Sequence, residues 1–106
     1  MGKTLMRDPN FKVEDAVGPA EQIGLLQYQI AYARDRVIQG DWSTSYAKDA
    51  IEFAAIATEL KLRHVHGCSY VDIYANLSYG ARAIFRWSYV DRNGAKESGQ
   101  SHPSIQ

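Results

Sequence analysis

The sequence predicts an all-α fold, a three-helix bundle built on an antiparallel helical hairpin. Three long stretches repeat apolar residues at intervals of three and four positions, the spacing of one face of an α-helix. Short polar or glycine-containing segments separate these stretches, so that consecutive helices fold back on one another. With 106 residues in total, we expect one helical domain at residues 19–91, an N-terminal arm at 1–18 and a disordered tail at 92–106.

The first helix is expected at residues 19–39. Pro19 suits a first helical turn, and Glu21 lies near the positive end of the helix dipole. Gly40 then provides a stop signal. The packing seam of this helix has an unbroken spacing of three and four: Ile23, Leu26, Ile30, Ala33 and Val37.

The second helix is expected at residues 44–66, with Ser43, Thr44 and Ser45 as N-cap candidates. It would be ~33 Å long, against ~31 Å for the first helix. Matching lengths and a short connection favour an antiparallel hairpin. A row of small residues would let the neighbouring helix approach closely: Ala47, Ala50, Ala54 and Ala57.

A third helix is expected from Ser69 to about Val90, because residues 69–72 resemble a capping box. A turn at 91–94 would end it, and the chain beyond is polar without an apolar period. Its core side would be a row at helical spacing: Ile73, Leu77, Ala81 and Ile84.

Composition narrows the function classes. The chain has 12 Lys and Arg against 12 Asp and Glu, and a net charge of zero argues against a protein that coats long nucleic acid. A small anionic ligand held by a few arginines stays compatible with this balance. We expect no membrane span, because no apolar run approaches the length needed. A single cysteine and an N-terminus without an apolar segment predict a cytoplasmic protein.

The main candidate binding site is a row of tyrosines and arginines near the C-terminus: Tyr79, Arg82, Arg86 and Tyr89. On a helix, their spacing of three, four and three would place all four on one face. Arginine forks onto phosphate and tyrosine stacks on a base, so this row suits a nucleotide. The alternative is an ordinary helix edge, where arginine stems cover the core and pair with carboxylates.

A second cluster, His64, His66 and Cys68, has side chains that can bind zinc or copper. The alternative is a helix C-terminus with favourably placed histidines. The sequence contains none of the common catalytic motifs, and we expect neither enzymatic activity nor a cofactor.

Residues 74–85 resemble the last helix of a family of small phage anti-defence proteins, the anti-CBASS and anti-Thoeris sponges. Residues 20–26 are similar to the preceding helix of that family. The family sequesters cyclic oligonucleotide signals of the host immune system. The resemblance implies a compact helical homo-oligomer in the host cytoplasm that binds cyclic nucleotides without cleaving them, with Arg82 and Arg86 in the phosphate site.

Two functions therefore stay open. The first is a non-enzymatic counter-defence protein that binds a small anionic nucleotide. The second is a helical module that inhibits or scaffolds a partner protein through an aromatic surface, since the chain has seven tyrosines and two tryptophans. In both cases the broad apolar faces of the first two helices predict a homo-oligomer.

Overall fold

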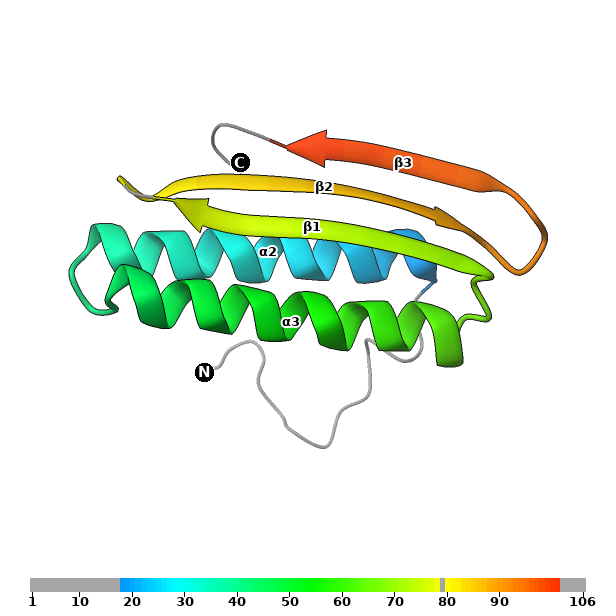
Figure 1. The fold of residues 1–106 in the computed structure, drawn as a ribbon, viewed down its shortest axis with the longest axis horizontal. Coiled ribbons are helices and arrows are strands. Elements are labelled where there is room, and N and C mark those ends of the chain that lie inside the picture. The colour runs from blue at the N-terminus through cyan, green and yellow to red at the C-terminus, as the bar shows by residue number, and fades with distance from the viewer. Residues whose placement is uncertain (1–17, 79, 102–106) are drawn as a thin grey trace.

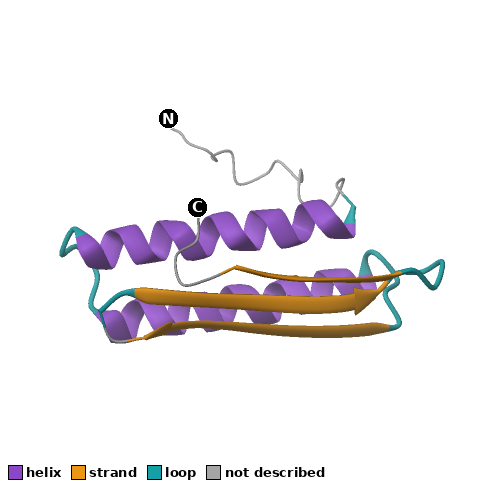
Figure 2. Cartoon of the chain, turned by 90° about the horizontal axis from the view of Figure 1, so that it is seen from above, coloured by secondary structure: helices purple, strands orange, loops and turns teal. Residues whose placement is uncertain are grey.

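The computed structural model describes residues 18–78 and 80–101 and has an α+β fold. Two antiparallel helices, α2 (Pro19–Ile38) and α3 (Thr44–His64), form one layer. A three-stranded antiparallel sheet forms the other, as Figures 1 and 2 show. Its strands are β1 (Tyr70–Ser78), β2 (Arg82–Val90) and β3 (Lys96–Ser101). The prediction of an all-α three-helix bundle is therefore wrong.

Both helices of the predicted hairpin are confirmed. In α2, Pro19 occupies the first turn and Glu21 follows it, as the sequence indicates. In α3, the hydroxyl oxygen of the N-cap residue Ser43 accepts a hydrogen bond from the Tyr46 N–H at 3.0 Å. Gly40, at a φ of 83°, allows the tight connection between the helices. None of the helices in the described residues is long and apolar enough to cross a bilayer.

The predicted third helix is replaced by a β-hairpin. β1 and β2 pair in the register Tyr70↔Val90 through Ser78↔Arg82. Every second residue faces the helices, and these residues are apolar: Val71, Ile73, Ala75, Leu77, Ala83, Phe85, Trp87 and Tyr89. Apolar residues at every second position allow a sheet to bury one face. The row expected on a helix, with Ile73 and Ile84 among its members, would lie on both faces of this sheet.

The expected disordered tail contains a third strand. Asp91 starts the turn that leads to β3, and its carboxylate accepts hydrogen bonds from the N–H groups of Asn93 and Ala95. Gly94 provides the positive φ that this turn needs. β3 has little apolar content, but its backbone pairs with β2 from Lys96 onward. Backbone hydrogen bonding therefore orders a segment that hydropathy alone predicts to be disordered.

The core lies between the two layers. β1 packs mainly on α3, and β2 contacts α2. The largest fully buried side chains come from every element except β3: Leu26, Ile30, Ile51, Leu62, Leu77 and Phe85. Because the helices cover one face of the sheet, the opposite face carries no part of this core (Figure 1).

Candidate functional site

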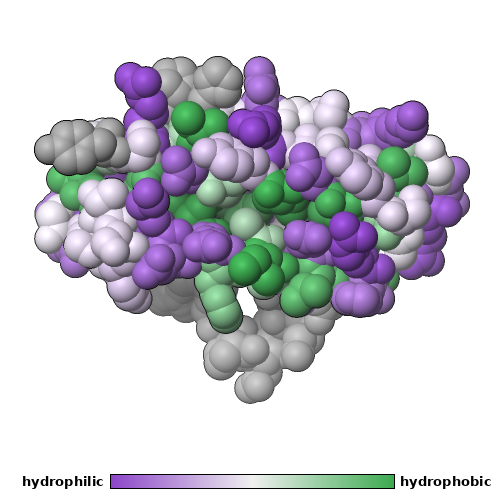
Figure 3. Space-filling view, viewed as in Figure 1, coloured by the Kyte–Doolittle hydropathy of each residue, from purple (hydrophilic) through white to green (hydrophobic). Residues whose placement is uncertain are grey.

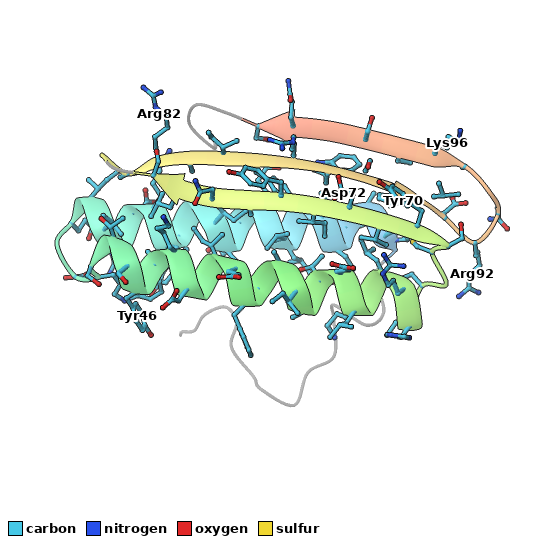
Figure 4. The ribbon with its side chains drawn as sticks, viewed as in Figure 1. Tyr46, Tyr70, Asp72, Arg82, Arg92 and Lys96 are labelled. Carbon is cyan, nitrogen blue, oxygen red and sulfur yellow. The ribbon has the colours of Figure 1, made fainter. Side chains whose placement is uncertain are left out.

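The candidate site is the face of the sheet that points away from the helices, which we call the outer sheet face. Strand register places thirteen side chains on it, in rows that run across the strands. No described helix or strand packs on this face (Figures 1 and 4). Its members are Tyr70, Asp72, Tyr74, Asn76 and Ser78 of β1, Arg82, Ile84, Arg86, Ser88 and Val90 of β2, and Lys96, Ser98 and Gln100 of β3.

A stacked pair of side chains lies at the centre of the outer sheet face. Tyr74 and Arg86 are cross-strand partners, and the Arg86 Cζ atom lies 4.2 Å from the centroid of the Tyr74 ring. Such a contact holds the guanidinium over the ring, which leaves its other planar face and its N–H groups available to a ligand. Tyr74 is 41% exposed and Arg86 is also exposed, so solvent reaches the pair.

Two further cations flank the pair. Arg82 lies four residues before Arg86 on β2, roughly 13 Å away at ~3.3 Å per strand residue. Figure 4 shows Arg82 extending away from the helices at one end of the sheet, and Lys96 near the other end on β3. Asp72 is the acidic residue among the thirteen, so the face carries a formal charge of +2, from three cations and one anion.

The structure brings together only part of the predicted tyrosine and arginine row. Arg82 and Arg86 share the outer sheet face. Tyr89 lies on the opposite face, 5% exposed, with its ring centroid 5.7 Å from that of Trp87. Burial raises the pKa of the Tyr89 hydroxyl, as expected for a core side chain. Tyr79 lies outside the described residues.

The histidine and cysteine cluster is not a metal site in this structure. His64 is exposed at the end of α3, whereas Cys68 is buried in the core. Residues 18–78 and 80–101 include no group of three His, Cys, Asp or Glu side chains able to hold a metal ion. Burial raises the pKa of the Cys68 thiol, so the thiol stays protonated at neutral pH. Thiolate is the form needed for metal binding or nucleophilic attack.

Sequence reasoning missed Tyr70, Tyr74 and Lys96 as members of the outer sheet face. Tyr70 and Tyr74 are four residues apart in β1, so they lie on the same face of the strand. The strict alternation of apolar and polar residues at 70–77 was the sequence signal for this strand. Lys96 belongs to β3, whose residues have a weak intrinsic preference for strand structure. Only its pairing with β2 places it here.

A second exposed surface lies on α3, on the side away from the sheet. We call it the α3 underside and define it by Phe53, Ile56, Ala57 and Leu60, which are all exposed. Phe53 is 77% exposed, an unusual value for so large an apolar side chain. Figure 3 shows hydrophobic side chains gathered along this edge of the molecule. Contiguous apolar exposure of this kind is typical of an interaction surface.

Comparisons of the chain with protein-family models, with curated proteins and with solved structures gave no match. The segment at 74–85, on which the resemblance to phage sponge proteins depends, forms most of the β1–β2 hairpin instead of a helix. The geometry and charge of the exposed surfaces are therefore the basis for inferring a function.

Proposed function

We propose that this protein is a non-enzymatic binding module that recognises a nucleotide on its outer sheet face. The observation that carries the proposal is the stacked Tyr74–Arg86 pair, which lies exposed at the centre of a face with a charge of +2. The pair contributes nothing to the core, because the helices pack on the other side of the sheet.

The chemistry of this face matches a phosphate joined to a flat base. A base can stack on the exposed plane of the Arg86 guanidinium, and arginine N–H groups donate to phosphate oxygens. Arg82 and Lys96 offer positions for further phosphates at intervals of roughly 13 Å along the strands. Hydroxyl groups of Ser88 and Ser98 lie between them in the register and can donate to sugar or base oxygens.

Two sources supply this ligand chemistry: small nucleotides, including cyclic signals, and short single-stranded nucleic acid. The zero net charge of the whole chain favours the small ligand, because a strand of many phosphates is usually bound by a basic field. Sequestration of a cyclic nucleotide without cleavage, as part of phage counter-defence, is the biological role that we propose for the small ligand.

The test is a binding titration followed by intrinsic tyrosine and tryptophan fluorescence or calorimetry. The ligands are cyclic dinucleotides, cyclic trinucleotides, mononucleotides and single-stranded oligonucleotides of four to eight residues. We expect Arg86→Gln to weaken binding at least tenfold. Arg86→Lys keeps the charge but not the flat stacking surface, so it should recover only part of the loss. Lys48→Gln, which removes an exposed charge from α3, is the matched control and should bind as the natural sequence does.

A ligand that binds equally to the natural chain and to Arg86→Gln would contradict the proposal, as would absence of binding by all ligands. Preference for oligonucleotides, with affinity rising with length, would assign the face to single-stranded nucleic acid. Preference for one cyclic class would assign it to a nucleotide signal.

A protein partner on the α3 underside is the second candidate function, and the 77% exposure of Phe53 favours it. A second copy of the chain is one such partner, which would give the homo-oligomer expected from the sequence. Light scattering after gel filtration distinguishes these cases. Phe53→Glu should convert an oligomer to a monomer without unfolding it, whereas an unchanged mass would move the interface elsewhere.

A further inference from the structure

The two edges of the sheet differ in a way that points to a second binding site. The strand order is β1-β2-β3, so β1 and β3 are the edges. β3 has six residues, has no apolar side chain and carries Lys96 at its start. Short, polar, lysine-bearing edges resist pairing with other chains. β1 has nine residues, rich in aromatic and β-branched types, and has none of these protective features on its inner positions.

Two hydrogen bonds fix the direction of the β1 backbone groups. The Val90 C=O accepts from Ser69 N–H at 3.0 Å, so the backbone of Val90 points toward β1. Backbone groups alternate along a strand, so Tyr89 points toward β3 and its partner Val71 points away from β2. Arg63 confirms this direction, because its Nη2 donates to the Val71 C=O at 3.2 Å from outside the sheet.

The same alternation assigns the rest of the edge. The N–H and C=O groups of Ile73, Ala75 and Leu77 point to the free side of β1. Among the described residues, no backbone partner from outside the sheet is found for these three residues. The edge therefore presents three donors and three acceptors in the repeat that an added strand requires.

A groove of about 460 Å³ runs beside this edge, between β1 and α3. Ile73 and Ala75 line one side, and Ala55 forms an apolar part of the other, where Ile56 borders both the groove and the α3 underside. The charged side chains that line it all come from α3: Lys48, Asp49, Glu52 and Glu59. Their formal sum is −2, and Glu59 is held by Arg63 at 3.1 Å. Asp49 and Glu52 are exposed and take no part in the described salt bridges.

We propose that the free edge of β1 and this groove bind an extended, lysine- or arginine-bearing peptide segment as a fourth strand of the sheet. Backbone hydrogen bonds to Ile73, Ala75 and Leu77 would hold the segment, as in other cases of strand addition. Every second side chain of the segment would face α3, where Asp49 and Glu52 attract a cation.

Charge argues against a second copy of this chain as the occupant. Twofold pairing of β1 with its own copy would bring the two α3 walls together, each with Asp49 and Glu52. Like charges brought together at an interface disfavour association. The groove also differs from the outer sheet face, which has the opposite sign. The two sites therefore select ligands of opposite charge. The inference about the groove does not depend on the nucleotide proposal.

The test uses a fluorescein-labelled seven-residue peptide in which lysine and valine alternate, with binding followed by anisotropy on the full chain. We expect saturable binding that weakens as salt is raised. The same peptide with glutamate in place of lysine should bind at least tenfold more weakly. Amide hydrogen exchange of Ile73, Ala75 and Leu77 should be fast in the free protein and should slow when the lysine peptide binds.

Two variants test the two parts of the site separately. Ala75→Pro removes an N–H that points to the free side, so the β1–β2 ladder stays intact while strand addition is interrupted. Glu52→Lys reverses a charge of the groove, and Glu97→Lys makes the same change on exposed β3 as its control. Both test variants should weaken peptide binding at least fivefold, whereas Glu97→Lys should leave it within twofold of the natural chain. Glu52→Lys keeps the test decisive if Ala75→Pro does not fold.

Several outcomes would overturn the proposal. Equal binding of the lysine and glutamate peptides would show that the acidic groove does not select a cationic segment. Slow amide exchange at all three residues in a peptide-free monomer would show that another segment of the chain, such as residues 1–17, already covers the edge. The same protection in a dimer would assign the edge to a second copy. Binding that ignores both variants would place the peptide elsewhere.

Discussion

The two faces of the sheet have different roles in stability and binding, although each strand has side chains on both faces. On β2, Phe85 and Ala83 are fully buried against the helices. Their neighbours Arg82 and Arg86 are exposed on the outer sheet face. Neighbouring positions thus have opposite surroundings because side chains alternate along a strand. The inner face determines whether the sheet forms, and the outer face is free to carry residues selected for another purpose.

Energetic magnitudes support this division. Burying a side chain the size of phenylalanine contributes ~1.5–3 kcal/mol relative to leaving it exposed. The exposed contact between Arg86 and Tyr74 contributes about 0.5–1 kcal/mol. A small domain has ~5–15 kcal/mol of stability in total. Changes on the inner face should therefore lower the free energy of unfolding, whereas changes on the outer sheet face should alter binding with little effect on stability.

The largest expected effect comes from Phe85→Ala. Phe85 is fully buried at the centre of the core, so truncation should lower the free energy of unfolding by ~3–5 kcal/mol. Urea denaturation followed by circular dichroism measures this loss. Ile84→Ala, on the adjacent outer position, is the control and should cost about 1 kcal/mol or less, because Ile84 is only partly buried. Equal losses at the two positions would contradict the division between the faces.

The next effect tests close packing at the β3 edge of the inner face. A Cβ atom added at Gly99 would lie 2.6 Å from the Trp87 Cζ2 atom, so the ring or the strand must shift. We expect Gly99→Ala to destabilise the protein by ~1–3 kcal/mol, as overpacking does. Ser98→Ala, one residue earlier on the outer sheet face, should change stability by less than about 0.5 kcal/mol.

A second substitution identifies the cause of that loss. Trp87→Leu removes the ring that the new methyl group would meet, so Gly99→Ala should cost much less in a Trp87→Leu background. A loss that is unchanged in this background would show that the backbone conformation at Gly99, and not the contact with Trp87, limits substitution.

The helices were predicted correctly from the sequence, whereas the sheet was not. In α2, the seam from Ile23 to Ala33 has helical spacing only, and the structure buries it. Residues 70–90 satisfy two periods at once. Ile73 and Leu77 are four apart, an interval that shares a face in a helix and also, being even, in a strand. The sequence signal for a strand was the strict alternation around them, followed by Gly80, which the structure places at the turn with a positive φ.

The intervals between residues also explain why only part of the tyrosine and arginine row was predicted correctly. Arg82 and Arg86 are four apart, so they lie on one face in either structure. Tyr89 is three residues from Arg86, and an odd interval places it on the opposite face of a strand. The shared face of Arg82 and Arg86 was therefore predictable, whereas the third cation, Lys96, and the aromatic neighbour of Arg86 depended on the fold. Tyr74 is that neighbour, and cross-strand pairing, which periodicity within one segment does not reveal, brings it to Arg86.

Alkaline pH should lower the free energy of unfolding gradually and by a smaller amount. Burial raises the pKa of the Cys68 thiol and of the Tyr89 hydroxyl above their ordinary values. The folded state holds these protons more tightly than the unfolded state does. Their contribution to stability is therefore complete below the unfolded pKa values, about 8.5 for cysteine and 10 for tyrosine, and is lost as the pH rises toward the folded values.

Urea denaturation at a series of pH values between about 7 and 10.5 measures this decline. Cys68→Ala is the matched variant, since it removes the group with the lower ordinary pKa and should delay the onset of the decline. Stability that rises over this interval, or an onset unchanged by Cys68→Ala, would contradict the assignment to the buried thiol.

The smallest expected change in stability is at Arg82, where the two faces should separate most clearly. Its side chain is exposed at the end of the outer sheet face and takes part in none of the described salt bridges, so Arg82→Gln should change the free energy of unfolding by less than about 0.5 kcal/mol. If the face binds a nucleotide, the same substitution should still weaken binding about threefold to tenfold, because a phosphate contact is lost. A loss of stability without a loss of binding would instead make Arg82 part of the fold. The division between a stabilising inner face and a binding outer face would then be wrong at the position where it is easiest to test.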